Sequence, residues 1–339
     1  MGEVKKIVTF ADKNLYLSKL NNMKRTLFII LLISAGIGRT AVAQDNLILI
    51  NGGSYKMGDF TDVGYKDARP LHDVVLDPFY MSKYQLTVGE FADFVKETGY
   101  VTDCEKKGGG FVFLIEDGRQ KLYFDSLACW KYTGHAPNDR LPVTFVSWVD
   151  AINYCNWKSE KESLQCCYQI IGDSVSWNKP AKGYRLLTEA EWEFVARSGG
   201  KDFIFAWGND SLPMINGQNA ANIKDQAFKN ANLPDAKIKP CWPGYNDGFI
   251  YPSPVGSFVP NELGIYDICG NVYEWCWDWY GTYSETPATN LTGPATGEKR
   301  VCRNVGYACP IEQVGATHRG ASKPNNYGVN MGFRIGRSK

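Results

Sequence analysis

The sequence predicts one loop-rich globular domain that mixes short strands with short helices. Hydrophobic residues make up 44% of the 339-residue chain and charged residues 22%, as is typical of globular proteins. Glycine (34), tryptophan (10) and tyrosine (19) are abundant, which favours many turns pinned by aromatic side chains. We find no linker, low-complexity block or fixed-period repeat after the N-terminal segment. The formal net charge of +1 gives no reason to expect nucleic acid as a partner.

Residues 1–43 have the features of an upstream extension followed by a secretory signal peptide. Met23 is the expected start, since two basic residues and the apolar run 27–33 follow it. Ala41-Val42-Ala43 supplies the small residues of a cleavage site, and the run is too short for a membrane anchor. We therefore expect a domain at 44–339 that is secreted or periplasmic and has no membrane span after signal cleavage.

All ten cysteines follow the expected cleavage site. Exported proteins can form disulfides, but ten cysteines allow too many pairings for an assignment from sequence. A zinc site is not indicated, because the chain has no Cys-x-x-Cys pair. Its three histidines, His72, His135 and His318, also lack the spacing of metal ligands.

Short strands are expected at the beginning of this domain. Residues 47–50 and the segment that follows Asn51-Gly52-Gly53 have the pattern of a hairpin with a glycine turn. Residues 72–76 and 79–84 have the composition of two further strands, on either side of Pro78.

Three helices are predicted by Ser/Thr-x-x-acid sequences, whose side chains satisfy the first free amides of a helix. These sequences begin at Thr87, Ser147 and Thr188. The first helix is expected to stop at Gly99 and the third at Gly199-Gly200. The segments between them have little periodicity. The longest, 209–260, requires a metal, disulfides or packed aromatic rings to order it.

The segment from Gly264 to Tyr280 contains three tryptophans and three carboxylates. Gly270-Asn271 predicts a tight turn that leads into a strand. With period two, one face of that strand carries the aromatic side chains Tyr273, Trp275, Trp277 and Trp279. Glu274 and Asp278 are then on the other face, where they are either solvated or bind a cation or a polar network.

Five stretches share their order and spacing with one known family: 97–106, 142–151, 184–193, 264–280 and 332–334. Together they resemble the formylglycine-generating enzyme, or sulfatase-modifying-factor, family over nearly the whole mature chain. The resemblance implies an α+β fold: a single formylglycine-generating-enzyme-type domain with a C-type-lectin-like core and little regular secondary structure. The chain would be a divergent member.

Members of this family bind two calcium ions, and the resemblance carries both ligand sets over to this chain. The first set is Asn222, the Ile223 carbonyl, Asp247 and the Phe249 carbonyl. The second is the Asp267 side chain, the carbonyls of Gly270 and Val272, and Glu274. Calcium prefers about six to eight hard oxygen ligands, and these residues supply such atoms. The alternative is that the polar residues only cap turns. We expect calcium at both positions.

Active members of the family oxidise a cysteine of a sulfatase peptide to formylglycine, using oxygen and a copper(I) ion held by two thiolates. Their cysteines follow an Arg-Gly-Gly-Ser-Tyr/Trp motif, which stands here as Arg303-Asn304-Val305-Gly306-Tyr307. Cys309 occupies the first cysteine position and is the candidate catalytic residue, but the second position is Val314. Copper is therefore not expected, since a rescue by Cys302 would place a sulfur on the wrong side of the turn.

His318 and Arg319 follow closely, and Arg319 matches an arginine that is common in the family. As a pair they are candidates for binding a carboxylate, with a structural salt bridge as the alternative. The resulting hypothesis is an exported, calcium-stabilised, non-oxidase binding or accessory module with a protein, peptide or glycan ligand. The alternative is a formylglycine-generating oxidase that acts on a sulfatase through Cys309.

Overall fold

The computed structural model describes residues 46–61, 65–231 and 240–339. Leu47 to Lys339 form one compact unit. The predicted start at Met23, the signal peptide and the domain boundary at residue 43 lie outside the described residues. Within the described ranges, no helix combines the length and the apolar character needed to cross a membrane.

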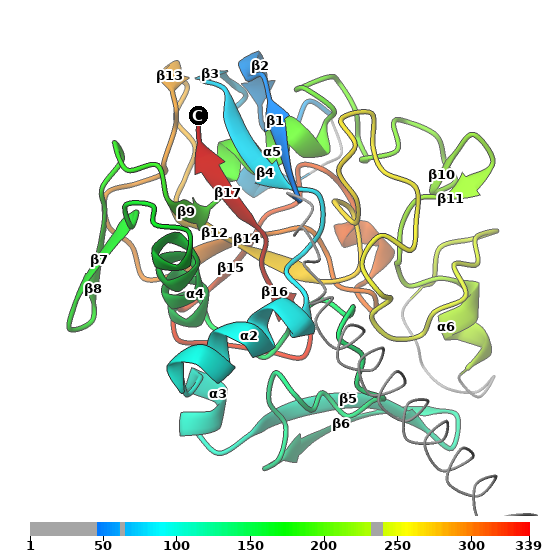
Figure 1. Cartoon of the computed structure of the whole chain (residues 1–339). Helices are drawn as coiled ribbons and strands as arrows, with labels where there is room; N and C mark the ends of the chain where they lie inside the picture. Colours follow the sequence, from blue (N-terminus) through cyan, green and yellow to red (C-terminus); the bar gives the residue numbers. More distant parts are fainter. Residues whose placement is uncertain (1–45, 62–64, 232–239) are drawn as a thin grey trace, which may run out of the picture. The chain divides into compact units, whose positions relative to one another are not determined.

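Three sheets form the framework of this unit (Figure 1). The first sheet has the spatial order β1 (Leu47–Ile50), β4 (Phe79–Ser82), β17 (Ile335–Ser338), β9 (Tyr184–Leu186). The second has the order β15 (Gly320–Ser322), β14 (Arg300–Arg303), β12 (Tyr273–Trp279), β16 (Met331–Gly332). The third has the order β13 (Ala288–Thr289), β3 (His72–Leu76), β2 (Gly53–Met57).

Hairpins and short helices complete the unit. The hairpins are β5 (Gly110–Glu116) with β6 (Arg119–Asp125), β7 (Tyr168–Ile171) with β8 (Ser174–Trp177), and β10 (Met214–Ile215) with β11 (Gln218–Asn219). The helices are α2 (Val88–Thr98), α3 (Asp103–Lys106), α4 (Trp148–Lys161), α5 (Glu189–Ala196) and α6 (Gln226–Asn230), with 3-10 turns η1 (Lys66–Ala68) and η2 (Ile311–Gln313). Few helices and many short strands confirm the expected α+β class.

The predicted helix starts are confirmed, and capping boxes explain them. The side chains of Thr87, Ser147 and Thr188 each accept a hydrogen bond from the backbone amide three residues later. The acidic side chain of that later residue accepts one in turn from the backbone amide of the capping residue. Gly99 ends α2 in the left-handed conformation, at φ 65°. A capping box also begins α3, at Thr102, where no helix start was predicted.

The expected hairpin at the start of the domain is wrong, although both of its strands exist. β1 pairs with β4, whereas β2 pairs with β3, so the two strands belong to different sheets. The glycine turn at Gly52 and Gly53 has positive φ angles of 71° and 141°. It carries the chain from one sheet to the other instead of folding it back.

The segment 209–260 is held largely by aromatic packing. The rings of Phe205 and Trp207 stack with centroids 4.5 Å apart, and Trp242 lies edge-on to both. Within the described ranges the structure contains no disulfide that could order this segment. Packed aromatic rings were one of the three explanations that the sequence left open.

Strand β12 runs through the middle of the described unit (Figure 1). It pairs antiparallel with β14 and parallel with β16, and α5 packs against it. Glu274 and Asp278 are 0% and 1% exposed, so their carboxylates are not solvated. Both faces of this strand are covered, and its acids require partners inside the protein.

Candidate functional site

Pairing of β12 with β14 brings the segment that contains Cys309 against the first residue of β12. The Cys309 thiol donates a hydrogen bond to the hydroxyl of Tyr273 over 3.4 Å. That hydroxyl in turn donates to Oε1 of Gln313 at 3.2 Å. Only 9% of Cys309 is exposed, and burial raises the pKa of its thiol, while the Tyr273 hydroxyl opposes this change. At neutral pH the sulfur is therefore a protonated thiol, the form that is neither a nucleophile nor a metal ligand.

Val314 and Cys302, the two positions considered for the second sulfur of a copper site, do not supply it beside Cys309. Val314 is buried in the same apolar cluster as Cys309 and offers no lone pair. Cys302 lies on β14 in a different apolar cluster, with Trp148 and Trp275, and burial raises the pKa of its thiol far above the ordinary value. Cys309 and Val314, the two positions that the family motif assigns to copper, do not fit a copper(I) ion held by two thiolates.

His318 and Arg319 are adjacent in sequence, but their side chains face different groups. The His318 ring lies edge-on to Tyr65, with centroids 5.0 Å apart, and 6.3 Å from the ring of Tyr273. Burial lowers the pKa of His318 to about 4, so the imidazole is neutral. Within the described residues its Nδ1 has no hydrogen-bond partner. His318 therefore belongs to the side of β12 that holds Cys309.

Arg319 points into a buried ion-pair network. Its Nε and Nη2 donate to the two carboxylate oxygens of Glu189 at 2.7 and 2.9 Å, and Arg303 pairs with the same carboxylate. The guanidinium also lies over the rings of Tyr280 and Tyr283. The structure thus places Arg319 in a salt bridge and does not bring it together with His318 as one anion site.

A cavity of about 250 Å³ opens beside this ion-pair network. Its lining includes His72, Asp278, Trp279, Tyr283 and Arg319. Burial raises the pKa of Asp278 well above its usual value, and the buried Tyr283 hydroxyl has no partner in the described part of the chain. Pockets that bury a drug-sized ligand have volumes of roughly 300–1,000 Å³. This cavity therefore suits one side chain or one sugar unit of a larger ligand.

The first expected calcium position has oxygen atoms that lack a positive partner. The Asp247 carboxylate accepts hydrogen bonds from the amides of Ile223 and Phe249, at 2.9 and 2.7 Å. Burial, together with the nearby Asp225, raises the pKa of Asp247 to about 7. Oδ1 of Asn222 is buried without a hydrogen-bond partner in the described residues, while its Nδ2 donates to the Tyr251 carbonyl. A buried carboxylate beside a free amide oxygen fits a calcium ion.

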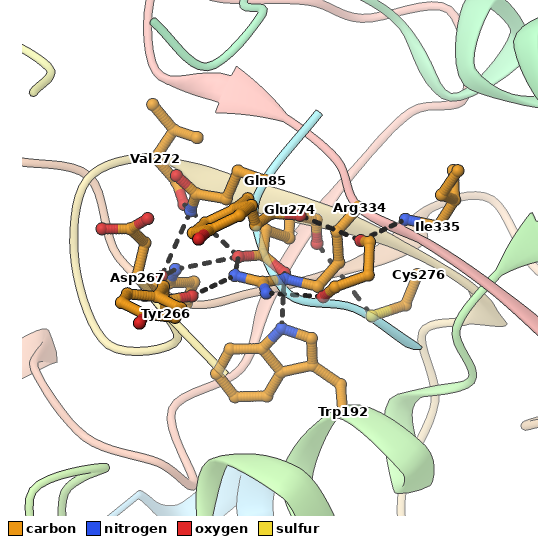
Figure 2. A network of polar contacts seen from close by, with 12 residues as sticks. Gln85, Trp192, Tyr266, Asp267, Val272, Glu274, Cys276, Arg334 and Ile335 are labelled. Atoms are coloured by element: carbon orange, nitrogen blue, oxygen red, sulfur yellow. Dashed lines mark hydrogen bonds and ion pairs between the residues drawn. The ribbon is translucent and has the colours of Figure 1, made fainter. Parts of the chain in front are cut away.

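The second expected position contains nitrogen donors among its oxygens (Figure 2). Nε2 of Gln85 lies 2.9 Å from Oε1 of Glu274 and 3.1 Å from the Val272 carbonyl. Nδ2 of Asn304 lies 2.8 Å from the carbonyls of both Asp267 and Gly270. Oδ2 of Asp267 accepts from the Gly256 amide at 2.8 Å, whereas its Oδ1 is buried without a hydrogen-bond partner in the described residues. The second position differs from the first in that Glu274 and the backbone carbonyls already have side-chain N–H donors.

Glu274 has a complete set of partners inside the protein. Arg334 donates to both of its carboxylate oxygens, at 2.6 and 2.7 Å, and the Trp192 indole donates at 2.8 Å (Figure 2). Within the described residues no three His, Cys, Asp or Glu side chains gather to hold a metal. A cation at either position would therefore depend on amide and carbonyl oxygens.

Three residues of this arrangement were not identified from sequence: Gln85, Tyr273 as a partner of Cys309, and Asn304. One signal was present for Asn304, because it replaces the first glycine of the Arg-Gly-Gly-Ser motif. Its φ is +70°, in the left-handed region that favours glycine and that asparagine tolerates.

The chain matches the sequence profile of the Sulfatase-modifying factor enzyme 1-like domain over residues 35–339. It belongs to this family. The formylglycine-generating enzyme of Streptomyces coelicolor is 32% identical over 311 residues, a match that covers 85% of this chain and 87% of that protein. The protein of Bos taurus named inactive C-alpha-formylglycine-generating enzyme 2 is 28% identical over 326 residues, covering 89% and 90%.

The solved structures include members with the same fold. The structure of PvdO from Pseudomonas aeruginosa matches with a TM-score of 0.61 and 27% identity, and covers 86% of this chain and 94% of that one. The family assignment and the single-domain fold expected from the motifs are therefore confirmed. The name of the Bos taurus relative shows that related chains include one described as inactive.

Proposed function

We propose that this chain is an exported, calcium-stabilised family member that has no oxidase activity and serves as a binding or accessory module. The environment of Cys309 carries the proposal: a single buried thiol, protonated at neutral pH, with Val314 where a second sulfur is required. The signal-peptide features of residues 23–43 support export. The relative named as inactive supports the loss of chemistry by analogy.

Binding is supported by the cavity that His72, Asp278 and Tyr283 line. Its polar groups lie beside the ring of Trp279, and an unpartnered hydroxyl of Tyr283 is available for a ligand group. This combination favours a protein, peptide or glycan ligand that inserts one polar unit.

The oxidase question is settled by oxygen uptake with a Cys-x-Pro-x-Arg peptide in the presence of copper(I). We expect no uptake above the protein-free rate, for the natural chain and for Cys309→Ser alike. Competition with a chromophoric copper(I) chelator should show no tight copper binding. Turnover that Cys309→Ser abolishes and Cys302→Ser leaves intact would establish the oxidase alternative.

We propose calcium at the first position, where Asn222 and Asp247 would hold it together with the carbonyls of Ile223 and Phe249. The ion would neutralise a buried carboxylate and fix the ends of the surrounding loop. An ion present at 100 times its dissociation constant stabilises the folded state by about 2.7 kcal/mol.

A chelator tests this proposal. EGTA should lower the melting temperature by several degrees, and Asp247→Asn should remove the calcium-dependent part of that change. Asp73→Asn, at an exposed residue of β3, is the matched control and should retain it. A melting temperature that is equal with calcium and with EGTA would remove calcium from the proposal.

A further inference from the structure

At the second calcium position, two neutral amides already donate to the Glu274 carboxylate and to the backbone carbonyls of Asp267, Gly270 and Val272. The Gln85 and Asn304 side chains together offer four N–H bonds. In the shortest contacts, Gln85 Nε2 donates to the Glu274 carboxylate and the Val272 carbonyl. Asn304 Nδ2 donates to the carbonyls of Asp267 and Gly270. Longer contacts of Gln85, at 3.3 and 3.5 Å, place the same nitrogen near the backbone carbonyls of Asp267 and Gly270 as well.

We propose that the amides of Gln85 and Asn304 permanently replace the cation at this position, and that Asn304 is the residue that closes it. The protein would then bind calcium at the first position only. The inference concerns the second position alone and does not depend on whether the first is occupied.

The orientation of the Gln85 amide follows from its surroundings. Every atom that its Nε2 faces at this position is an oxygen, so a reversed amide would place oxygen against oxygen. Its own Oε1 has no hydrogen-bond partner among the described residues. Gln85 is 1% exposed, so bulk water does not compete for these contacts.

The charge of Glu274 is also already balanced. Arg334 forms a two-point ion pair with Glu274, and both side chains are about 1% exposed. A divalent cation next to Glu274 would lie close to the Arg334 guanidinium and be repelled by it. The carboxylate therefore has no unmet requirement for a metal, unlike Asp247 at the first position.

Asn304 is held on both sides of its amide. Its Oδ1 accepts from the amides of Gly270 and Val305, at 2.6 and 2.8 Å, while Nδ2 donates to the two carbonyls. Because Oδ1 and Nδ2 of Asn304 are both hydrogen-bonded, the amide cannot turn, and Nδ2 stays where the cation would lie. Asn304→Asp keeps the shape of the side chain but replaces the Nδ2 donor with an oxygen. This places a negative charge where calcium would bind.

Calcium stoichiometry, measured by titration calorimetry on the full mature chain, tests the proposal. In an Asp247→Asn background, which removes the first position, we expect no calcium binding. Introducing Asn304→Asp into that background should create one binding event and make the melting temperature depend on calcium. Gln85→Glu in the same background should act in the same direction and serves if the aspartate variant fails to fold.

The outcomes separate this inference from the proposal for the first position. A chain that binds no calcium at all, yet gains a site with Asn304→Asp, leaves the replacement intact and removes calcium from the proposed function. Retention of one calcium by Asp247→Asn, lost again on Glu274→Gln, would overturn the replacement.

Discussion

Tyr273 and Glu274 are neighbours in β12, and their side chains point to opposite sides of the strand. On the Glu274 side, Arg334, Trp192, Gln85 and Asn304 all donate to one carboxylate. On the Tyr273 side, Cys309 has a single side-chain partner and His318 has an unpartnered ring nitrogen. Within the described residues Glu274 has four side-chain donors, whereas the Tyr273 side has few polar contacts and is largely apolar. Stability and chemistry are thus separable across one strand.

The largest expected effect is on the Glu274 side. Arg334→Met removes one partner of a buried ion pair and leaves the carboxylate under-compensated, which costs about 3–5 kcal/mol of unfolding free energy. Urea denaturation measures this loss. Arg337→Met, three residues further along the chain in β17 and more exposed, is the matched control and should cost less than about 1 kcal/mol.

A double variant sharpens the same point. Glu274→Gln combined with Arg334→Met should be less destabilising than the sum of the two single changes, because neither charge is then left alone. Strict additivity would mean that the two side chains do not act as a pair.

A smaller effect is expected on the Tyr273 side, from the buried imidazole. Burial lowers the pKa of His318 to about 4, below its ordinary value of 6.5, so the unfolded chain binds this proton more tightly. The stability is present above pH 6.5 and is lost as the pH falls towards 4, by up to about 3 kcal/mol. His318→Gln should flatten that loss in urea midpoints measured between pH 7 and 4.5.

His135 provides a second point on the same profile. Burial lowers the pKa of His135 to about 4 as well, so His135→Gln should flatten the profile in the same direction. The double variant should flatten it further. A profile that neither substitution changes would show that both rings are protonated without cost in the folded state.

The smallest effect is expected at the contact between Tyr273 and Cys309. Tyr273→Phe removes the hydrogen bonds of the hydroxyl with Cys309 and Gln313, at a cost of about 1 kcal/mol each, and raises the pKa of the Cys309 thiol further. Alkylation of Cys309 by iodoacetamide, followed by peptide mass spectrometry, should become slower. Cys302 is the internal control, because its labelling should not change. Faster labelling of Cys309 would instead show that the hydroxyl shields the sulfur.

The sequence identified the elements that depend on local contacts. A Ser/Thr-x-x-acid sequence carries both partners of a capping box within four residues, so the starts of α2, α4 and α5 were predictable. Strand pairing depends on residues far apart in the chain, which is why β1 and β2 were wrongly expected to form a hairpin. The family motifs located the expected calcium ligands and Cys309 but not what surrounds them.

The sequence by itself determined the family, the α+β class, the missing second cysteine and the start of each long helix. Only the tertiary structure decided that Gln85, from the loop before α2, meets Asn304, after β14, at the second calcium position. It also decided that Glu274 and Asp278 are buried, and that His318 and Arg319 face different groups. The reason is physical: two side chains 219 positions apart that donate to the same Gly270 carbonyl leave no signature in the local pattern of either segment.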